Sequence, residues 1–448
     1  MRTCPPSSGL RRRQLRRTAW ALVALASLSL IVPEHGWSVN GLDLIGSGGM
    51  STGLAGADTA IALDFSTINT NPAGMSFVGN SWAAGLSFGM LKSEQTLTNA
   101  QNNREGQDHP LFLGNSGILY HLPNTKVTLG IGFFTVGGLT SDFRDLATPL
   151  GTTDRIGSQL RHYKITPTIS YQFTPRLSLG ASLGLSYTDV SLAVLPNSPG
   201  APGLGVGFQS EGSCDRHNGL APPTGNCLYA LGIVPKFGLM YRLTDTVTFG
   251  IAYTMASNLP LRNGRVTQNL GLIGLGTATY DAKATGLKWA DDIAVGLAFQ
   301  PNPDWLLSFK FQWINWDGAL NSVVFDLSNG SNPLVPTSQT TFALNWRDQY
   351  VVAVGSAYHV NEWLMVHGGY NFGNDPTRTQ YIDPTTANIT VHHFVGGVTY
   401  KFTPGMWLDV LTTYVLPNEV TYNHPLWGPN TTSRIAGYDV IASFSYRR

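Results

Sequence analysis

Hydrophobic and polar residues alternate along most of the chain beyond residue 80. In the stretch "WLLSFKFQW" at 305–313, Phe309 and Phe311 fall on one side of an extended chain, and Ser308 and Lys310 fall on the other. Successive side chains of a β-strand point to opposite faces, so this alternation predicts a strand with one apolar and one polar face. The pattern recurs often enough to predict an all-β chain.

Fourteen segments show this alternation, and the lengths of the connections between them alternate as well. Short turns such as "PNT", "TPR" and "TDT" follow the even-numbered segments, and long connections follow the odd-numbered ones. The segments are 80–91, 112–122, 125–137, 158–173, 176–190, 228–242, 246–256, 289–300, 304–316, 342–359, 362–372, 390–402, 405–415 and 434–446. The long connections are 92–111, 138–157, 191–227, 257–288, 317–341, 373–389 and 416–433.

A sheet with every long connection at one end is typical of a barrel in a bacterial outer membrane. Such barrels have short periplasmic turns and long extracellular loops, and aromatic residues border their apolar band. The sheet must close on itself because lipid cannot satisfy the hydrogen bonds of an open edge. We therefore predict a 14-stranded antiparallel transmembrane β-barrel over residues 80–448.

The first 37 residues have the composition of a secretory signal peptide. An apolar run from Ala19 to Val32 follows a cluster of basic residues, and it is too short to be a spanning helix. The basic residues are Arg11, Arg12, Arg13, Arg16 and Arg17. We expect cleavage between Pro33 and Asn40. No later run is apolar and long enough for a transmembrane helix, which agrees with a protein exported to the bacterial outer membrane.

The composition supports a chain in contact with both lipid and water. Charged residues are only 12% of the chain, whereas Gly (50) and aromatic residues (11%) are abundant. Residues 1–37 contain six of the 28 basic and one of the 27 acidic residues, which leaves 22 basic and 26 acidic residues in the mature chain. A mildly acidic chain argues against nucleic acid as a partner.

Two cysteines remain after removal of the signal peptide. Cys214 and Cys227 flank "DRHNGLAPPTGN" in a long connection. In an oxidising compartment such a pair is best interpreted as a disulfide, and the alternative, a metal site, lacks a second pair of ligands. We therefore expect a disulfide and no metal.

A compact, glycine-rich segment at 38–79 precedes the first predicted strand. A barrel of this size encloses more volume than its own side chains fill, so this segment is suitable material for a plug in the lumen. Its sequence, "NGLDLIGSGGMSTGLAGADTAIALDFSTINTNPAGM", resembles the N-terminal hatch of the FadL/TodX family, outer-membrane transporters of long-chain fatty acids and other hydrophobic compounds. The matching features are Gly53–Ala57, Asp64 and the triplet Asn71-Pro72-Ala73. The resemblance extends through later strands, such as "GIGFFTVGGLTSDF" and "VPKFGLMYRLTDTVTFGIAYTM".

The resemblance implies passive uptake of hydrophobic small molecules, fatty acids or hydrocarbons. These molecules would first be captured by apolar loops, such as "LGVGF" in 191–227 and "LGLIGLG" in 257–288. They would then bind in the lumen against the hatch and leave laterally through a kink in the third strand. The residues that we expect to bind substrate or gate the hatch are Leu42, Leu44, Ile45, Asn71, Pro72 and Ala73. Those expected at the kink are Phe133, Phe134, Gly137 and Gly138, because glycine weakens strand pairing. The possible contacts to a carboxylate are Lys164, Lys236 and Lys310, whose alternative role is ordinary pore lining.

Members of this family usually end in an aromatic residue, whereas this chain ends Tyr446-Arg447-Arg448. We expect a monomer whose other partners are outer-membrane lipid, lipopolysaccharide and the barrel-assembly machinery.

Motifs that would indicate an enzyme or a cofactor have simpler interpretations. The Gly-x-Ser-x-Gly matches at 85–89 and 180–184 lie inside predicted strands, whereas a nucleophile elbow requires a strand-to-helix turn. His392 and His393 have no further metal ligands close in sequence. We therefore expect neither catalysis nor a cofactor. The alternative functions are a general diffusion porin and an outer-membrane lipase.

Overall fold

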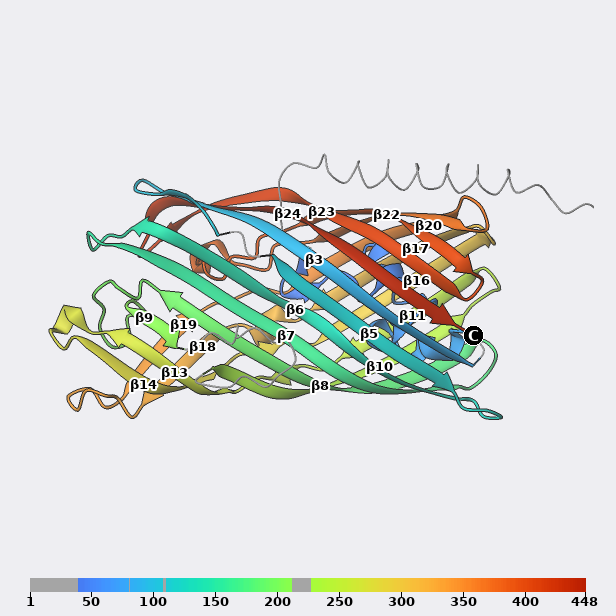
Figure 1. Cartoon of the computed structure of the whole chain (residues 1–448), viewed down its shortest axis with the longest axis horizontal. Helices are drawn as coiled ribbons and strands as arrows, with labels where there is room; N and C mark the ends of the chain where they lie inside the picture. The colour runs from blue at the N-terminus through green and yellow to red at the C-terminus, as the bar shows by residue number, and fades with distance from the viewer. Residues whose placement is uncertain (1–38, 80, 108–109, 212–226) are drawn as a thin grey trace, which may run out of the picture. The chain divides into compact units, whose positions relative to one another are not determined.

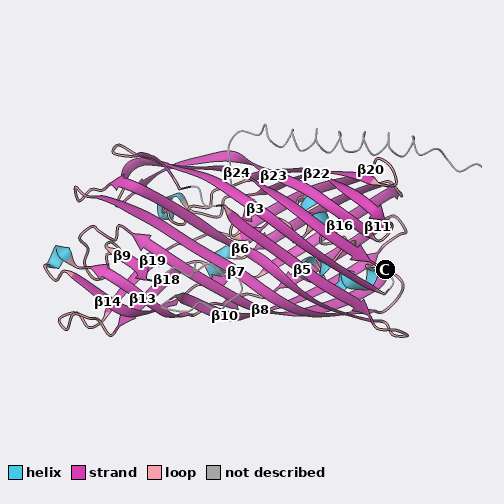
Figure 2. Ribbon diagram, in the orientation of Figure 1, coloured by secondary structure: helices cyan, strands magenta, loops and turns pink. Residues whose placement is uncertain are grey.

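The computed structural model describes residues 39–79, 81–107, 110–211 and 227–448. These residues form an all-β closed antiparallel barrel (Figures 1 and 2). The signal peptide predicted at 1–37 lies outside the described residues, as does Cys214.

The barrel closes because its last strand, β24, pairs antiparallel with β3, the first strand of the circuit. The circuit runs through β3 (Trp82–Thr98), β5 (Leu111–His121), β6 (Val127–Ala147), β7 (Thr153–Gln172), β8 (Leu177–Val194), β10 (Leu228–Arg242), β11 (Val247–Thr254), β16 (Asp292–Asn302), β17 (Trp305–Ile314), β20 (Gln349–His359), β21 (Leu364–Gly373), β22 (His392–Thr403), β23 (Met406–His424) and β24 (Gly428–Arg447). Each of the fourteen segments predicted from the sequence overlaps one of these strands.

The predicted number of strands is nevertheless wrong for the sheet as a whole. Within the described residues the main sheet contains 22 strands, and two short strands pair separately. The reason is that long connections expected to be loops, and part of the N-terminal segment, are themselves hydrogen-bonded as strands. The additional strands are β1 (Val39–Asn40), β2 (Asp43–Leu44), β4 (Asn103–Glu105), β9 (Phe208–Glu211), β12 (Ser257–Asn258), β13 (Leu261–Asn269), β14 (Thr277–Thr285), β15 (Lys288–Trp289), β18 (Ser322–Ser328) and β19 (Ser338–Ala343).

The two faces of the barrel strands differ as the alternation predicts. On β17, Phe309 and Phe311 are 42% and 41% exposed on the outside, whereas Ser308 and Lys310 are 3% and 9% exposed on the inside. Large apolar side chains are exposed around much of the circuit. No helix in the described part of the chain is long and apolar enough to cross a membrane.

Residues 39–79 form a compact N-terminal segment that the barrel strands surround (blue in Figure 1). It contains the short helices α2 (Gly49–Gly53) and α3 (Thr67–Thr70) and the 3-10 helix η1 (Pro72–Phe77). Hydrogen bonds tie it to several sides of the wall: Ser76 pairs with Ser170 on β7, Ser308 on β17 donates to Ala57 O, and Asn371 on β21 donates to Ala55 O. Three other short helices lie in the connections, η2 (Gly271–Ile273), α4 (Trp316–Ala319) and η3 (Thr379–Tyr381).

Candidate functional site

An apolar cavity of about 420 Å³ lies between the N-terminal segment, the barrel wall and the long connections. Leu42 forms part of its lining from the N-terminal segment and is only 1% exposed. The other apolar lining residues include Leu139, Leu160, Val190, Leu192, Val206, Leu261, Leu287, Leu320, Val323, Phe325, Phe342, Leu344, Trp346, Ile382 and Leu426. No Lys or Arg is among the described lining residues, so the cavity suits a ligand without negative charge.

Aromatic side chains stiffen this cavity on the loop side. Phe325 on β18 and Phe342 on β19 pack edge to face with ring centroids 5.5 Å apart, and Phe208 contacts both rings. Trp346 packs edge to face against Trp316, with ring centroids 5.6 Å apart. Such edge-to-face pairs add stability beyond the burial of their area. The cavity wall is therefore preformed.

The connection 374–391 folds inward and covers one side of the cavity. Ser158 on β7 donates a hydrogen bond to Thr385 O, and Thr390 Oγ1 donates to Val39 O at 3.2 Å. Asp383 accepts hydrogen bonds from Thr385 and lies 3.2 Å from His424 Nε2. Burial raises the pKa of Asp383, but the hydrogen bonds from His424 and Thr385 outweigh it and lower the pKa overall. This anionic group is the main polar feature of the cavity.

Strand β6 bulges inward where it meets the N-terminal segment. Its register with β7 shifts between Thr135 and Gly137, and Gly137 pairs with Asp43 of β2. The next amide, Gly138 N–H, donates a hydrogen bond of 3.0 Å to Leu42 O. A Cβ at Gly137 would overlap that carbonyl oxygen, so only glycine permits this approach.

The pairing between β5 and β6 ends at the same place. Asn115 pairs with Phe134, and the first residues of β5, Leu111–Gly114, have no register with β6. Phe134 is buried and stacks on Phe65 of the N-terminal segment, whereas Phe133 faces outward and stacks on Tyr163 at 6.0 Å. The backbone ladder between β5 and β6 thus stops beside Leu42, where the side chains of Thr135 and Asn115 make the bonds between the two strands.

The three lysines predicted as carboxylate contacts line a second, smaller cavity of about 100 Å³. Lys236 Nζ donates to Asn69 O at 2.8 Å, and Lys310 Nζ lies 3.7 Å from Asp58 Oδ1. Lys164, Asp43 and Asp292 line the same cavity. Acidic side chains therefore face these lysines. The sequence did not predict these acidic neighbours.

Asp43 accepts a hydrogen bond of 2.8 Å from Trp289 Nε1. Burial and the neighbouring charge of Asp292 raise the pKa of Asp43 to about 7, although Trp289, Lys164 and Lys236 oppose the shift. Residues Leu44 and Ile45 line the same polar cavity.

Asn71 links the N-terminal segment to the wall and begins helix η1. Its Nδ2 donates to Thr59 O and Leu239 O, and its Oδ1 accepts from Ala73 N–H as an N-cap. Pro72 occupies the first turn of the helix, where its missing N–H has no cost. These residues fix the segment and line neither the apolar nor the polar cavity.

The residues expected to bind substrate thus separate into three groups. Leu42 lines the apolar cavity, Leu44 and Ile45 line the polar one, and the triplet 71–73 holds the segment in place. Of the two loop stretches expected to capture ligand, Leu204 and Val206 reach the apolar cavity, whereas Leu272 and Ile273 remain exposed.

Sequence reasoning missed the contributions of connections 317–341 and 373–389. The alternating stretch "SVVFDLS" was a signal for the first, but nothing in the second indicates that it folds inward. Cys227 is buried immediately before β10, and the disulfide expected from it stays a prediction.

His392 and His393 lie on β22, where Tyr370 hydrogen-bonds His392. In the described residues no group of three or more His, Cys, Asp or Glu side chains could hold a metal ion.

The fold and site define a class of protein, a closed β-barrel of the outer membrane that encloses a folded N-terminal segment and an apolar cavity. Residues 28–444 match the model of the family described as outer membrane protein transport protein (OMPP1/FadL/TodX). The chain belongs to this family, and the protein is accordingly an outer-membrane transport protein.

Solved structures show the same fold at low sequence identity. The toluene transporter TodX of P. putida aligns with a TM-score of 0.74 and 18% identity, covering 91% of this chain and 99% of that one. The toluene transporter TbuX of Ralstonia pickettii aligns with a TM-score of 0.69 and 18% identity, covering 90% of this chain and 98% of that one. A Pseudomonas aeruginosa FadL homologue aligns with a TM-score of 0.68 and 15% identity, covering 91% of this chain and 99% of that one. No curated protein matches the chain.

Proposed function

We propose that this protein carries neutral hydrophobic molecules, aromatic or aliphatic hydrocarbons, across the outer membrane. The observation that supports this proposal best is the apolar cavity of about 420 Å³ beside Leu42. Its aromatic wall and its lack of lysine and arginine, among the described lining residues, favour an uncharged ligand. Asp383 at its edge would repel a carboxylate. Similarity to the toluene transporters TodX and TbuX agrees with this cargo.

The route runs from the loops to the side of the barrel. Leu204 and Val206 offer the first apolar contacts, and residues 38–79 act as the hatch that closes the lumen below the cavity. The cargo leaves laterally between β5 and β6, where hydrogen-bonded pairing stops at Asn115 and Phe134. Lateral release suits a hydrocarbon because it never has to enter water.

Fatty acids are the alternative cargo, with Lys164, Lys236 and Lys310 as carboxylate contacts. The small size of their cavity, about 100 Å³, and the facing acids Asp43 and Asp58 argue against this role. A general diffusion porin would need an open lumen, which the N-terminal segment fills. A lipase would need a catalytic serine and histidine pair, and the two Gly-x-Ser-x-Gly matches lie on strands β3 and β8.

The test is uptake of labelled toluene and labelled oleate by cells that lack other transporters of this kind. Val323→Trp fills the apolar cavity, and Val324→Trp places the same side chain on the opposite face of β18. We expect Val323→Trp to abolish toluene uptake and Val324→Trp to leave it unchanged. Equal uptake by both variants, or uptake of oleate alone, would refute the proposal.

A further inference from the structure

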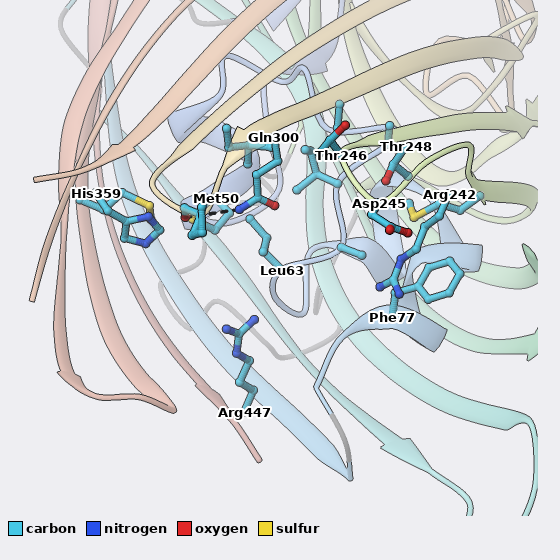
Figure 3. A pocket seen from close by; sticks show the side chains of 18 of the residues that line it. Met50, Leu63, Phe77, Arg242, Asp245, Thr246, Thr248, Gln300, His359 and Arg447 are labelled. Carbon is cyan, nitrogen blue, oxygen red and sulfur yellow. Dashed lines mark hydrogen bonds between the residues drawn. The ribbon is translucent and has the colours of Figure 1, made fainter. Parts of the chain in front are cut away.

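A cavity of about 690 Å³ lies at the opposite end of the barrel, beside the short turns (Figure 3). Thr244, Asp245, Pro303 and Pro404 of those turns are part of its lining. Short turns of an outer-membrane barrel face the periplasm, so this cavity opens on the periplasmic side. It shares no lining residue with the apolar cavity near Leu42.

The inner part of this cavity is apolar and includes residues 60–63 of the N-terminal segment. Met50 and Leu63 are labelled there in Figure 3. The wall adds flexible or small apolar side chains, namely Met240, Ala298, Leu306 and Met365. Methionine adapts its shape to irregular ligands, so this surface suits an alkyl chain.

Three cations surround the apolar part. The Arg242 guanidinium lies 4.1 Å from the Phe77 ring centre, and Arg447 lies 5.3 Å from that of Trp407. The third cation, Lys401, contacts a histidine, with its Nζ 2.6 Å from His359 Nε2. Among the described residues none of the three cations forms an ion pair with a carboxylate.

The acid in the lining does not neutralise these cations. Asp245 pairs with Arg176 at 3.0 Å, and its side chain is 92% exposed. The cavity therefore has an uncompensated positive charge next to an apolar surface.

Trp407 provides an independent indication of a ligand. It lines the same cavity, is only 6% exposed, and its indole N–H has no hydrogen-bond partner in the described part of the chain. A buried donor without a partner is costly, and the cost is relieved when an acceptor binds. Indole is a donor only, so the matching group is an acceptor such as a carboxylate oxygen.

We propose that this periplasmic cavity binds an amphiphile with one alkyl chain and a carboxylate. The carboxylate lies between Lys401 and Arg447, within reach of the Trp407 indole, and the chain extends along Met50 and Leu63. This proposal does not rest on the cargo proposed above, because the two cavities are separate. Occupancy would press on the N-terminal segment from its periplasmic side.

The test uses dodecanoate with a diazirine near its methyl end, photolysed with the full chain in lipid nanodiscs. The same diazirine on dodecyltrimethylammonium and on dodecanol controls for charge and for simple partition. We expect dodecanoate to label peptides that contain Met50–Leu63, Met240 or Leu306, with the ammonium analogue giving little label. Equal labelling by the cation and the anion would overturn the proposal.

Variants locate the charge requirement. Lys401→Gln and Arg447→Gln together should lower dodecanoate labelling about tenfold, the effect of one lost charge-assisted hydrogen bond. Lys126→Gln removes an exposed cation from another turn outside the cavity and should change nothing. If the double variant does not fold, Lys401→Gln alone replaces it. Unchanged labelling in a folded variant refutes this site, while toluene uptake tests the other proposal separately.

Discussion

The side-chain amide of Asn71 donates a hydrogen bond of 3.0 Å to the carbonyl oxygen of Leu239 on the barrel wall. The same amide donates at 2.8 Å to Thr59 O, and the side-chain oxygen accepts from Ala73 N–H at 3.2 Å. One residue thus satisfies a loop carbonyl, a wall carbonyl and a helix N-terminus. Leu239 lies next to Gly238, where a Cβ would overlap Asn71 Oδ1.

Asn71→Ala should loosen the N-terminal segment without unfolding the barrel. The substitution leaves buried backbone groups unsatisfied, at about 1–3 kcal/mol each, but the strand ladder remains intact. We expect higher conductance across planar bilayers and a normal shift of the folded band on unheated gels. Asn69→Ala is the matched control, because among the described residues its amide bonds only Ser47, which belongs to the same segment. Wild-type conductance in folded Asn71→Ala would exclude this asparagine as the anchor.

Gly137→Ala should displace Leu42 from the wall. The added methyl group would overlap Leu42 O, so the pairing of β2 with β6 must shift. We expect reduced toluene uptake from a folded barrel. Gly114→Ala, on β5 beside the same gap, meets no atom within 4 Å and serves as the control. If both variants transport like the wild type, the bulge has no part in transport.

Arginine on the two faces of β17 should produce two different defects. Phe309→Arg places a charge on the exposed apolar face, which costs up to about 2–4 kcal/mol in the membrane midplane. It should lower the folded fraction on unheated gels. Ser308 faces inward, where its hydroxyl bonds Ala57 O, so Ser308→Arg should leave the barrel folded but expel the segment and raise conductance. Identical defects in both variants would contradict this assignment of faces.

The barrel strands could be predicted from sequence because one face contacts lipid and the other water, which imposes a strict period of two. Strand pairs beyond the membrane, such as β13 with β14, are not under that constraint and were missed. The alternation places Ser308 on the polar face of its strand but does not identify its partner. In the structure Ser308 bonds Ala57 O of the N-terminal segment, and no local pattern reports such a contact.

The candidate site was less predictable than the strands. Asp43 and Trp289 are 246 positions apart, and their hydrogen bond depends on how the segment is seated in the barrel. The importance of the motif around Asn71 could be predicted because helix capping depends only on residues close in sequence. By contrast, the apolar cavity collects residues from many connections, each of which is an ordinary surface loop in isolation.

Docking of the N-terminal segment should weaken as the pH rises. The pKa of Asp43 increases from 3.8 to about 7, chiefly through burial and the charge of Asp292, so the docked segment holds a proton that a released one would lose. The contribution of this proton is fully present below pH 3.8 and is lost as the pH rises through about 7. We expect more frequent channel openings in planar bilayers at pH 8.5 than at pH 5.5. Asp43→Asn, which keeps an acceptor for Trp289, should make openings independent of pH, whereas the exposed Asp245→Asn should behave as the wild type. A wild-type protein with the same openings at both pH values would show that Asp43 does not control docking.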